Sequence, residues 1–224
     1  TFCATGHEGL TRNLSSAEMI CQIVAVQNDF GCRVTNLVSM GQGEPFQNYQ
    51  ATLEALRFAN AKDGLEIGAR HITVSTCGII QGIERLANEP EQFTLAVSLH
   101  SALQDVRNEI MPRCSNIPLP HLKKALRSYI EKTGRRVSFE YLLIKGVTDT
   151  EENLAALIDF CDGLLCHVNL LSVNEVEGRP YKPSSTATQQ RWVKELKSAG
   201  KEATIRNSRG SDIDGACGQL KNKM

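Results

Sequence analysis

The sequence has no excess of charge of either sign. Its 25 basic residues equal its 25 acidic residues, so no overall positive field points to a nucleic-acid partner, although local basic clusters could still contact phosphate. It also lacks a long apolar run. Stretches such as residues 20–26 are too short to span a bilayer, and no signal-peptide pattern opens the chain. We therefore expect a cytoplasmic protein.

Paired metal-ligand spacings are also missing. The eight cysteines follow no regular spacing, and a chain of 224 residues can bury a core without disulfides, so we expect reduced thiols. No Cys-x-x-Cys or His-x-x-x-His spacing is present, so the residues do not complete a zinc or iron–sulfur ligand set by themselves. The sequence starts at Thr1 without an initiator methionine, and we expect the natural protein to begin upstream.

Segments of helical periodicity alternate with short apolar runs that have the length and composition of buried parallel strands. Ser15 stands three residues before Glu18, a capping-box spacing that predicts the start of a helix, and Asp149 with Glu152 predicts another. Strands are expected at residues 34–39, 71–75, 93–98, 137–144, 166–171 and 202–206, and helices at residues 15–29, 48–60, after 79, 118–132, 149–161 and 188–198.

Six strands separated by helices favour a parallel sheet with right-handed crossovers over any all-β or helical-bundle design. The sequence contains no internal repeat, low-complexity tract or flexible linker. We therefore predict an α/β fold, an incomplete (β/α)6-type barrel, in a single domain that covers residues 1–224.

Polar residues and glycines follow almost every predicted strand. Such clusters stand at residues 40–45, 75–78, 98–101 and 206–210, and Asn174 follows the fifth strand. One such cluster is typical of an ordinary turn. Five clusters in register with the strand order favour an enzyme, because the loops after the carboxyl ends of barrel strands meet on one face.

Single residues in these clusters allow more than one interpretation. The amides of Gly41 and Gly43 could hold a carboxylate or phosphate and Glu44 a cationic amine, or the three could form a glycine-rich turn with a solvated carboxylate. His100 could be a base, a metal ligand, a hydrogen-bond donor or a packed histidine. Cys217 could be a nucleophile among small residues or a packing residue, since no neighbouring histidine or lysine lowers its pKa.

Taken in order, these segments resemble the radical S-adenosylmethionine (SAM) 23S rRNA adenine-C2 methyltransferases over essentially the whole chain. The specificity of the resemblance lies in the ordered set rather than in any single motif. The matching runs are residues 2–6, 9–14, 40–45, 72–78, 98–101, 169–174 and 212–220.

The resemblance implies a radical SAM barrel whose first strand and N-terminal helical domain are missing here. The family's cluster motif is Cys-x-x-x-Cys-x-x-Cys, and Cys3 looks like its third cysteine. With the other two missing, these residues alone should neither hold a [4Fe-4S] cluster nor be active. By resemblance, Gly43 and Glu44 contact the methionine end of SAM. The rest of the pocket is implied to be Ser75, Ser98, Leu99, His100 and Asn174.

Cys217 looks like the cysteine that a first SAM methylates, after which a radical derived from a second SAM abstracts a hydrogen atom from that methyl group. The resulting carbon radical adds to C2 of adenine, which is too electron-poor to attack a methyl sulfonium itself. The implied partners are 23S rRNA, tRNA and a flavodoxin-type electron donor, with no membrane and no particular oligomer. Two alternatives stay open, a C8-methylating resistance enzyme of the same family and a non-catalytic remnant. Pro45 and residues 209–210 favour C2.

Overall fold

The computed structural model describes residues 1–3, 9–174 and 180–206, so Cys217 and its neighbours lie outside the described residues. Its centre is one six-stranded sheet in which every strand is parallel to its neighbours and the order is β1-β2-β3-β4-β5-β6. The strands are β1 (Leu37–Ser39), β2 (Ile72–Thr76), β3 (Thr94–Ser98), β4 (Val137–Leu143), β5 (Cys166–Ser172) and β6 (Glu202–Arg206).

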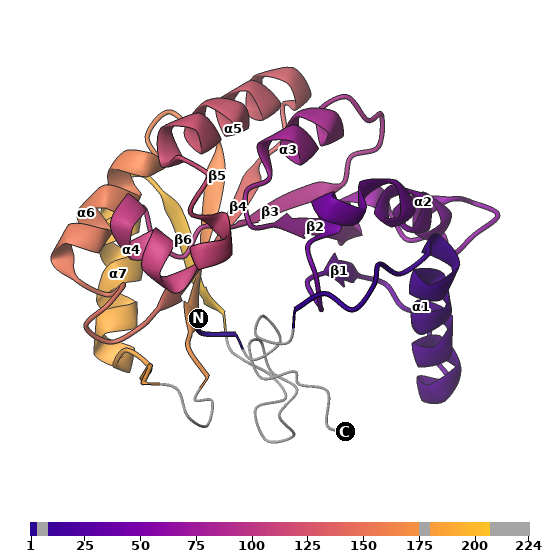
Figure 1. Cartoon of the computed structure of the whole chain (residues 1–224), viewed down its shortest axis with the longest axis horizontal. Coiled ribbons are helices and arrows are strands. Elements are labelled where there is room, and N and C mark those ends of the chain that lie inside the picture. The colour runs from indigo at the N-terminus through magenta and orange to yellow at the C-terminus, as the bar shows by residue number, and fades with distance from the viewer. Residues whose placement is uncertain (4–8, 175–179, 207–224) are drawn as a thin grey trace.

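The helices lie along the outer side of an arc, and the strands lie inside it (Figure 1). Among the described residues β1 and β6 pair with no further strand, so the sheet is a curved, open partial barrel. This confirms the predicted α/β class and barrel type. The helices are α1 (Ser16–Phe30), α2 (Tyr49–Asn60), α3 (Ile80–Leu86), α4 (Gln104–Ile110), α5 (Leu119–Thr133), α6 (Glu151–Phe160) and α7 (Thr186–Ser198), with short 3-10 turns η2 (Pro45–Asn48), η3 (Ala69–His71) and η4 (Pro112–Cys114).

The predicted capping box at the start of α1 is present. Glu18 N–H donates to the Ser15 hydroxyl over 3.3 Å, and Ser15 N–H donates to the Glu18 carboxylate over 2.9 Å. The cap predicted for α6 is wrong by one residue. Thr150 rather than Asp149 caps this helix, because its hydroxyl accepts the Asn153 N–H.

Two further differences concern the elements themselves. The first strand is shorter than predicted, since β1 begins at Leu37. The sequence analysis also missed α4, which occupies only seven residues between Gln104 and Ile110. Two turns of helix hold too few apolar positions for a clear 3.6-residue period.

The main core lies between the sheet and the outer helices. Along β4, Val137, Phe139 and Tyr141 belong to this core, and the Tyr141 ring lies 5.3 Å from the ring of the fully buried Trp192 on α7. Because side chains alternate along a strand, Ser138 and Glu140 point to the opposite face of the sheet, the concave face inside the arc. The concave face therefore carries polar residues at positions where the apolar strand pattern alone would predict a core.

No helix in the described portion of the chain is long and apolar enough to cross a membrane. The main apolar core fills the space between sheet and helices, and a second, smaller cluster contains Ile110, Leu142, Ile144 and Val173. Because the strands are parallel, the carboxyl ends of all six lie along the same side of the sheet, which we call the carboxyl edge, and their amino ends lie along the opposite side, the amino edge. The candidate site lies at the carboxyl edge.

Candidate active site

The loop after β1 is held to the loop after β2 by one carboxylate. Glu44 accepts the N–H of Phe46 over 3.1 Å through Oε1 and the N–H of Cys77 over 2.7 Å through Oε2. Gly43, directly before it, has φ +87°, and a Cβ at this position would meet no atom within 4 Å. The backbone here therefore faces open space in a conformation that favours glycine, as close approach of a ligand requires.

Two hydroxyl-bearing strand positions come next along the same edge. The Ser75 hydroxyl donates to the carbonyl of Ser39 over 2.6 Å, which ties β2 to the end of β1. Ser98 ends β3 and lies in register beside Glu140 of β4. Both predicted pocket serines therefore stand at or near the carboxyl ends of neighbouring strands.

The turn after β3 is fixed by β4. The N–H groups of Leu99 and His100 both donate to the carbonyl of Glu140, each over 3.1 Å. His100 has φ +56°, an uncommon conformation for a non-glycine residue. Strained residues of this kind cluster at ligand sites, because the surrounding structure must hold them in place.

The imidazole of His100 is buried, and both an aromatic ring and a positive charge lie near it. Burial first, and the positive charge of Arg107 second, lower the pKa of His100 to about 3, so the ring is neutral at physiological pH. Its Nδ1 has no hydrogen-bond partner among the described residues. The ring of Phe2 lies edge-on to it at 4.9 Å. This nitrogen is buried, so it contacts neither a protein partner among the described residues nor solvent.

The N-terminal residues lie beside this turn. Thr1 donates to the carbonyl of Ile110 over 2.6 Å through its amino group, and its hydroxyl lies 2.6 Å from the Tyr181 hydroxyl. Cys3 follows and is half-buried. The described residues contain no group of three His, Cys, Asp or Glu side chains that could hold a metal ion. An iron–sulfur cluster therefore does not fit the described residues alone, which offer Cys3 as a single thiolate near the edge.

A polar row lies on the concave face of the sheet, and of its four residues only Ser98 was predicted to belong to the site. Ser98, Glu140, Asn169 and Thr204 stand in register on β3, β4, β5 and β6. Asn169 Nδ2 donates to Glu140 Oε1 over 2.8 Å, and the Thr204 hydroxyl donates to Asn169 Oδ1 over 3.1 Å. Arg206 Nη1 lies 3.9 Å from Glu140 Oε2. Burial raises the pKa of Glu140. A charged residue inside an apolar strand was the available signal.

A second missed residue lies on α4. Arg107 is completely buried, and its guanidinium donates to the carbonyls of Cys77 over 2.6 Å and Leu99 over 3.2 Å. The sequence analysis had no reason to single it out, because it did not recognise α4.

The structure thus arranges the predicted pocket residues along one edge. Gly43 and Glu44 follow β1, and Ser75 belongs to β2. Ser98 ends β3 and is followed by Leu99 and His100, while Asn174 stands just beyond β5. Cys217 lies outside the described residues.

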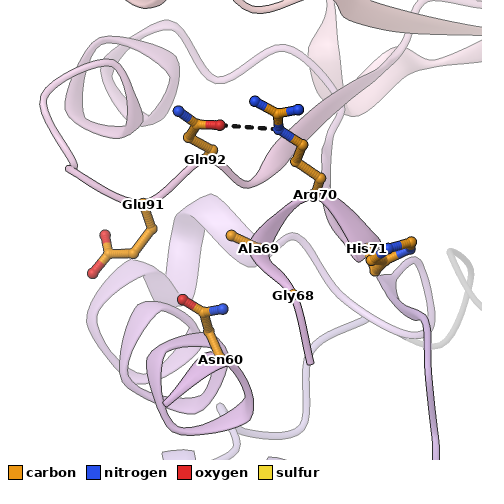
Figure 2. A pocket seen from close by; sticks show the side chains of 7 residues that line it. All are labelled: Asn60, Gly68, Ala69, Arg70, His71, Glu91 and Gln92. Atoms are coloured by element: carbon orange, nitrogen blue, oxygen red, sulfur yellow. Dashed lines mark hydrogen bonds between the residues drawn. The ribbon is translucent and has the colours of Figure 1, made fainter. Parts of the chain in front are cut away.

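Cavities occur at the opposite edge of the sheet. Figure 2 shows one of about 480 Å³, in which the Arg70 and Gln92 side chains are joined by a 3.0 Å hydrogen bond. It lies where η3 leads into β2 and where the chain approaches β3, which are amino ends of strands. No predicted site residue lines it, so we do not take this cavity as the candidate site. Its lining residues are Asn60, Gly68, Ala69, Arg70, His71, Glu91 and Gln92.

Comparison with protein families gives a match to the radical SAM superfamily over residues 1–158. Among curated proteins, the chain is 46% identical over 223 residues to a probable dual-specificity RNA methyltransferase RlmN of Alkaliphilus oremlandii, covering 100% of this chain and 65% of that protein. It is likewise 46% identical over 222 residues to the protein of that name in Clostridioides difficile, covering 99% of this chain and 65% of the relative. The chain therefore spans about 65% of the length of these relatives.

Solved structures give the same picture. A radical SAM methyltransferase from Sphaerobacter thermophilus superposes with a TM-score of 0.95 at 46% identity, covering 100% of this chain and 66% of that one. SuiB of Streptococcus suis, solved with S-adenosylmethionine bound, superposes with a TM-score of 0.63 at 19% identity, covering 89% of this chain and 45% of SuiB. The second likeness concerns the fold alone.

Proposed function

The chain belongs to the radical SAM superfamily, and from this premise we propose that it is the catalytic core of an RNA methyltransferase that methylates C2 of an adenine in 23S rRNA and in tRNA. The cofactors of the superfamily are a [4Fe-4S] cluster and SAM. The proposal takes residues 1–224 as one radical SAM core domain. The observation that carries it is the polar edge after β1, β2, β3 and β5, in a chain 46% identical to a probable dual-specificity RNA methyltransferase.

The edge has the chemistry that SAM needs. Glu44 uses one direction on each carboxylate oxygen for Phe46 and Cys77, which leaves acceptor capacity for an ammonium group. The open backbone at Gly43 gives room beside it. The proposal gives the buried Nδ1 of the neutral His100 ring a polar group of the ligand as its partner. In the proposal, Ser75, Ser98, Leu99 and Asn174 complete the pocket.

The cluster, when bound, supplies the electron that cleaves SAM reductively and so starts the radical chemistry. Cys3 is the residue proposed to ligate it. Because the sequence contains no Cys-x-x-x-Cys-x-x-Cys motif and the described residues hold no complete ligand set, we propose that these 224 residues by themselves are inactive.

Cys217 is proposed to carry the methyl group as S-methylcysteine. Adenine C2 is a poor nucleophile, so direct transfer from a methyl sulfonium is unfavourable, whereas a carbon radical on the sulfur-bound methyl can add to it. The protein's part in such chemistry is to orient the groups and to exclude quenching solvent. We place the reaction in the cytoplasm, with a flavodoxin-type protein as electron donor.

The test uses the full-length protein, reconstituted anaerobically with iron and sulfide and supplied with SAM, a reductant and fragments of 23S rRNA or tRNA. Cys217→Ala is expected to abolish RNA methylation but to retain formation of 5′-deoxyadenosine. Cys32→Ala, which removes an exposed thiol on the outer side, is the matched control and should methylate normally.

Mass spectrometry of the digested RNA then decides between outcomes. A methyl group at C2 of adenine supports the proposal, and a methyl group at C8 selects the resistance-type enzyme instead. Full methylation by Cys217→Ala would contradict the proposed route.

A further inference from the structure

Arg107 is a buried cation without a matching buried anion. Its side chain is 0% exposed, and no carboxylate within the described ranges lies close enough to form an ion pair with it. Burial lowers its pKa. Because an uncompensated charge is costly to bury, a residue kept in this state must gain from its hydrogen bonds.

The guanidinium donates hydrogen bonds to backbone carbonyls in three separate turns. Nη2 donates to Cys77 over 2.6 Å, Nε donates to Leu99 over 3.2 Å, and Nη1 reaches Cys114 at 3.5 Å. Cys77 follows β2, Leu99 follows β3, and Cys114 ends η4. A planar fork with five N–H groups can serve three carbonyls at once, which an ammonium on a flexible stem cannot do in the same geometry.

The peptide groups around Cys77 are held from both sides. The N–H of Cys77 donates to Glu44 over 2.7 Å, while its carbonyl accepts from Arg107. The acceptor of the first bond is a carboxylate and the donor of the second is a guanidinium, and a charged partner of this kind strengthens each bond. The turn after β2 is therefore fixed between the turn after β1 and helix α4.

The series of contacts continues across the edge. Arg107 holds the carbonyl of Leu99, and the N–H groups of Leu99 and His100 donate to the carbonyl of Glu140. From Glu44 to Glu140, one hydrogen-bonded series thus links the ends of β1, β2 and β3 to β4. Arg107 is the member that joins its two halves, because no other side chain in the described part of the chain bonds both Cys77 and Leu99.

We propose that Arg107 is a positioning residue for the SAM pocket, holding the turns after β2 and β3 at the separation that the bound ligand requires. This inference rests on the proposed function, since the pocket is the one proposed above. Arg107 acts through the backbone and does not touch the ligand. The Leu99 carbonyl that Arg107 holds also accepts the N–H of Ser101 over 2.7 Å, and this bond closes the tight turn in which His100 has its positive φ.

The first experiment measures binding of S-adenosylhomocysteine, an unreactive analogue, to the full-length reconstituted protein by calorimetry. Arg107→Lys keeps the charge but not the fork, and Arg107→Gln keeps two N–H donors without the charge. We expect the Kd to rise at least tenfold for the lysine variant and further for the glutamine variant. Arg113→Lys, an exposed arginine six residues further along, is the matched control and should leave the Kd unchanged.

Circular dichroism melting separates positioning from simple stability. A merely structural arginine would lower the Tm and leave the Kd unchanged well below the Tm, and that result would overturn the proposal. In turnover assays, the positioning role predicts that the KM for SAM rises by a larger factor than kcat falls.

Amide hydrogen exchange on the unmodified protein tests the proposal without a variant. The amides of Cys77, Leu99 and His100 should slow together when S-adenosylhomocysteine binds, since they belong to one bonded series. Independent exchange of Cys77 and His100 would contradict it. If the unmodified protein binds no analogue at all, the proposed function fails. The inference about Arg107 fails separately if binding occurs and the lysine variant matches the unmodified protein.

Discussion

Charged side chains at the two edges of the sheet differ in how deeply they are buried and in what they bond to. At the amino edge, Arg57 pairs with Glu89 and Glu91 over 2.7 Å each. Its side chain stays 40% exposed, and the two carboxylates are 20% and 18% exposed. At the carboxyl edge, Arg107 and Glu140 are buried almost completely, and their strongest partners are backbone or amide groups. Exposed ion pairs contribute little to stability, whereas buried charges are costly unless every bond is made.

This difference in burial and bonding identifies the functional edge better than the presence of a cavity does. The amino edge contains the cavity of Figure 2, yet its polar groups are those of an ordinary solvated surface. The carboxyl edge combines His100 with its positive φ, an imidazole nitrogen that has no partner among the described residues, and hydrogen bonds to charged side chains. Strained backbone and buried polar groups without a partner raise the free energy of the folded protein, and they are typical of sites that bind and orient a ligand.

Among substitutions that compare the two edges, Glu44→Ala is expected to have the largest effect on stability and on SAM binding. The substitution leaves the N–H groups of Phe46 and Cys77 without their acceptor. We expect a loss of about 3 kcal/mol in unfolding free energy, from two bonds to a charged group, and loss of measurable SAM binding. Urea unfolding and calorimetry measure the two quantities.

Glu91→Ala is its matched partner at the other edge. It removes a carboxylate that is 18% exposed, but Arg57 is 40% exposed and keeps Glu89 as a partner, so the expected loss is only about 1 kcal/mol, with SAM binding intact. Equal effects of the two substitutions would break the comparison.

A medium effect is expected from Gly43→Ala. The glycine has φ +87° and open space around the missing Cβ, so the substitution costs backbone strain rather than a clash. We predict a loss of about 1–2 kcal/mol in unfolding free energy and weaker SAM binding. Gly41→Ala, in equally open space but without a positive φ, is the control and should be nearly neutral. A greater loss in the control would refute the strain argument.

The smallest expected effect concerns pH. Because burial raises the pKa of Glu140 in the folded protein, the folded state holds the proton more tightly than the unfolded state does. The stability from this group is fully present below the ordinary glutamate pKa and is lost as pH rises through the raised one. Glu140→Gln cannot ionise, so its unfolding free energy should not show this decline.

Unfolding curves at several pH values, compared with Glu202→Gln at the exposed amino end of β6, check the assignment. Identical pH dependence in Glu140→Gln and the unmodified protein would exclude Glu140 as the cause.

The sequence predicted the fold better than it predicted the bonding within the site. Strand and helix order followed from periodicity, and the Ser15 capping box follows from local chemistry alone. The short α4 and the cap at Thr150 were not predictable to the residue, because short helices give weak periodic signals. The roles of Arg107 and Glu140 depend on contacts between turns far apart in sequence, which no local pattern encodes.

The pocket residues were named from strand ends and from resemblance, and their arrangement along one edge agrees with the barrel topology. Their roles in binding stay predictions, as does that of Cys217. What the structure adds is the reason for particular residues, such as the double contact of Glu44, which spacing alone left as an even choice between a ligand group and a solvated turn.

The strand order has a consequence for how the chain folds. From β2 to β6, each strand pairs with the strand that precedes it in sequence, so a partner is already synthesised when each of these strands emerges. On a ribosome, where chains emerge at about 5–20 residues per second, the sheet can grow one β/α unit at a time, and each new helix covers the strand just added. Pairing between successive strands closes shorter loops than pairing between distant strands would, so each closure costs less entropy. All residues proposed for the SAM pocket, from Gly43 to Asn174, would then be synthesised before β6.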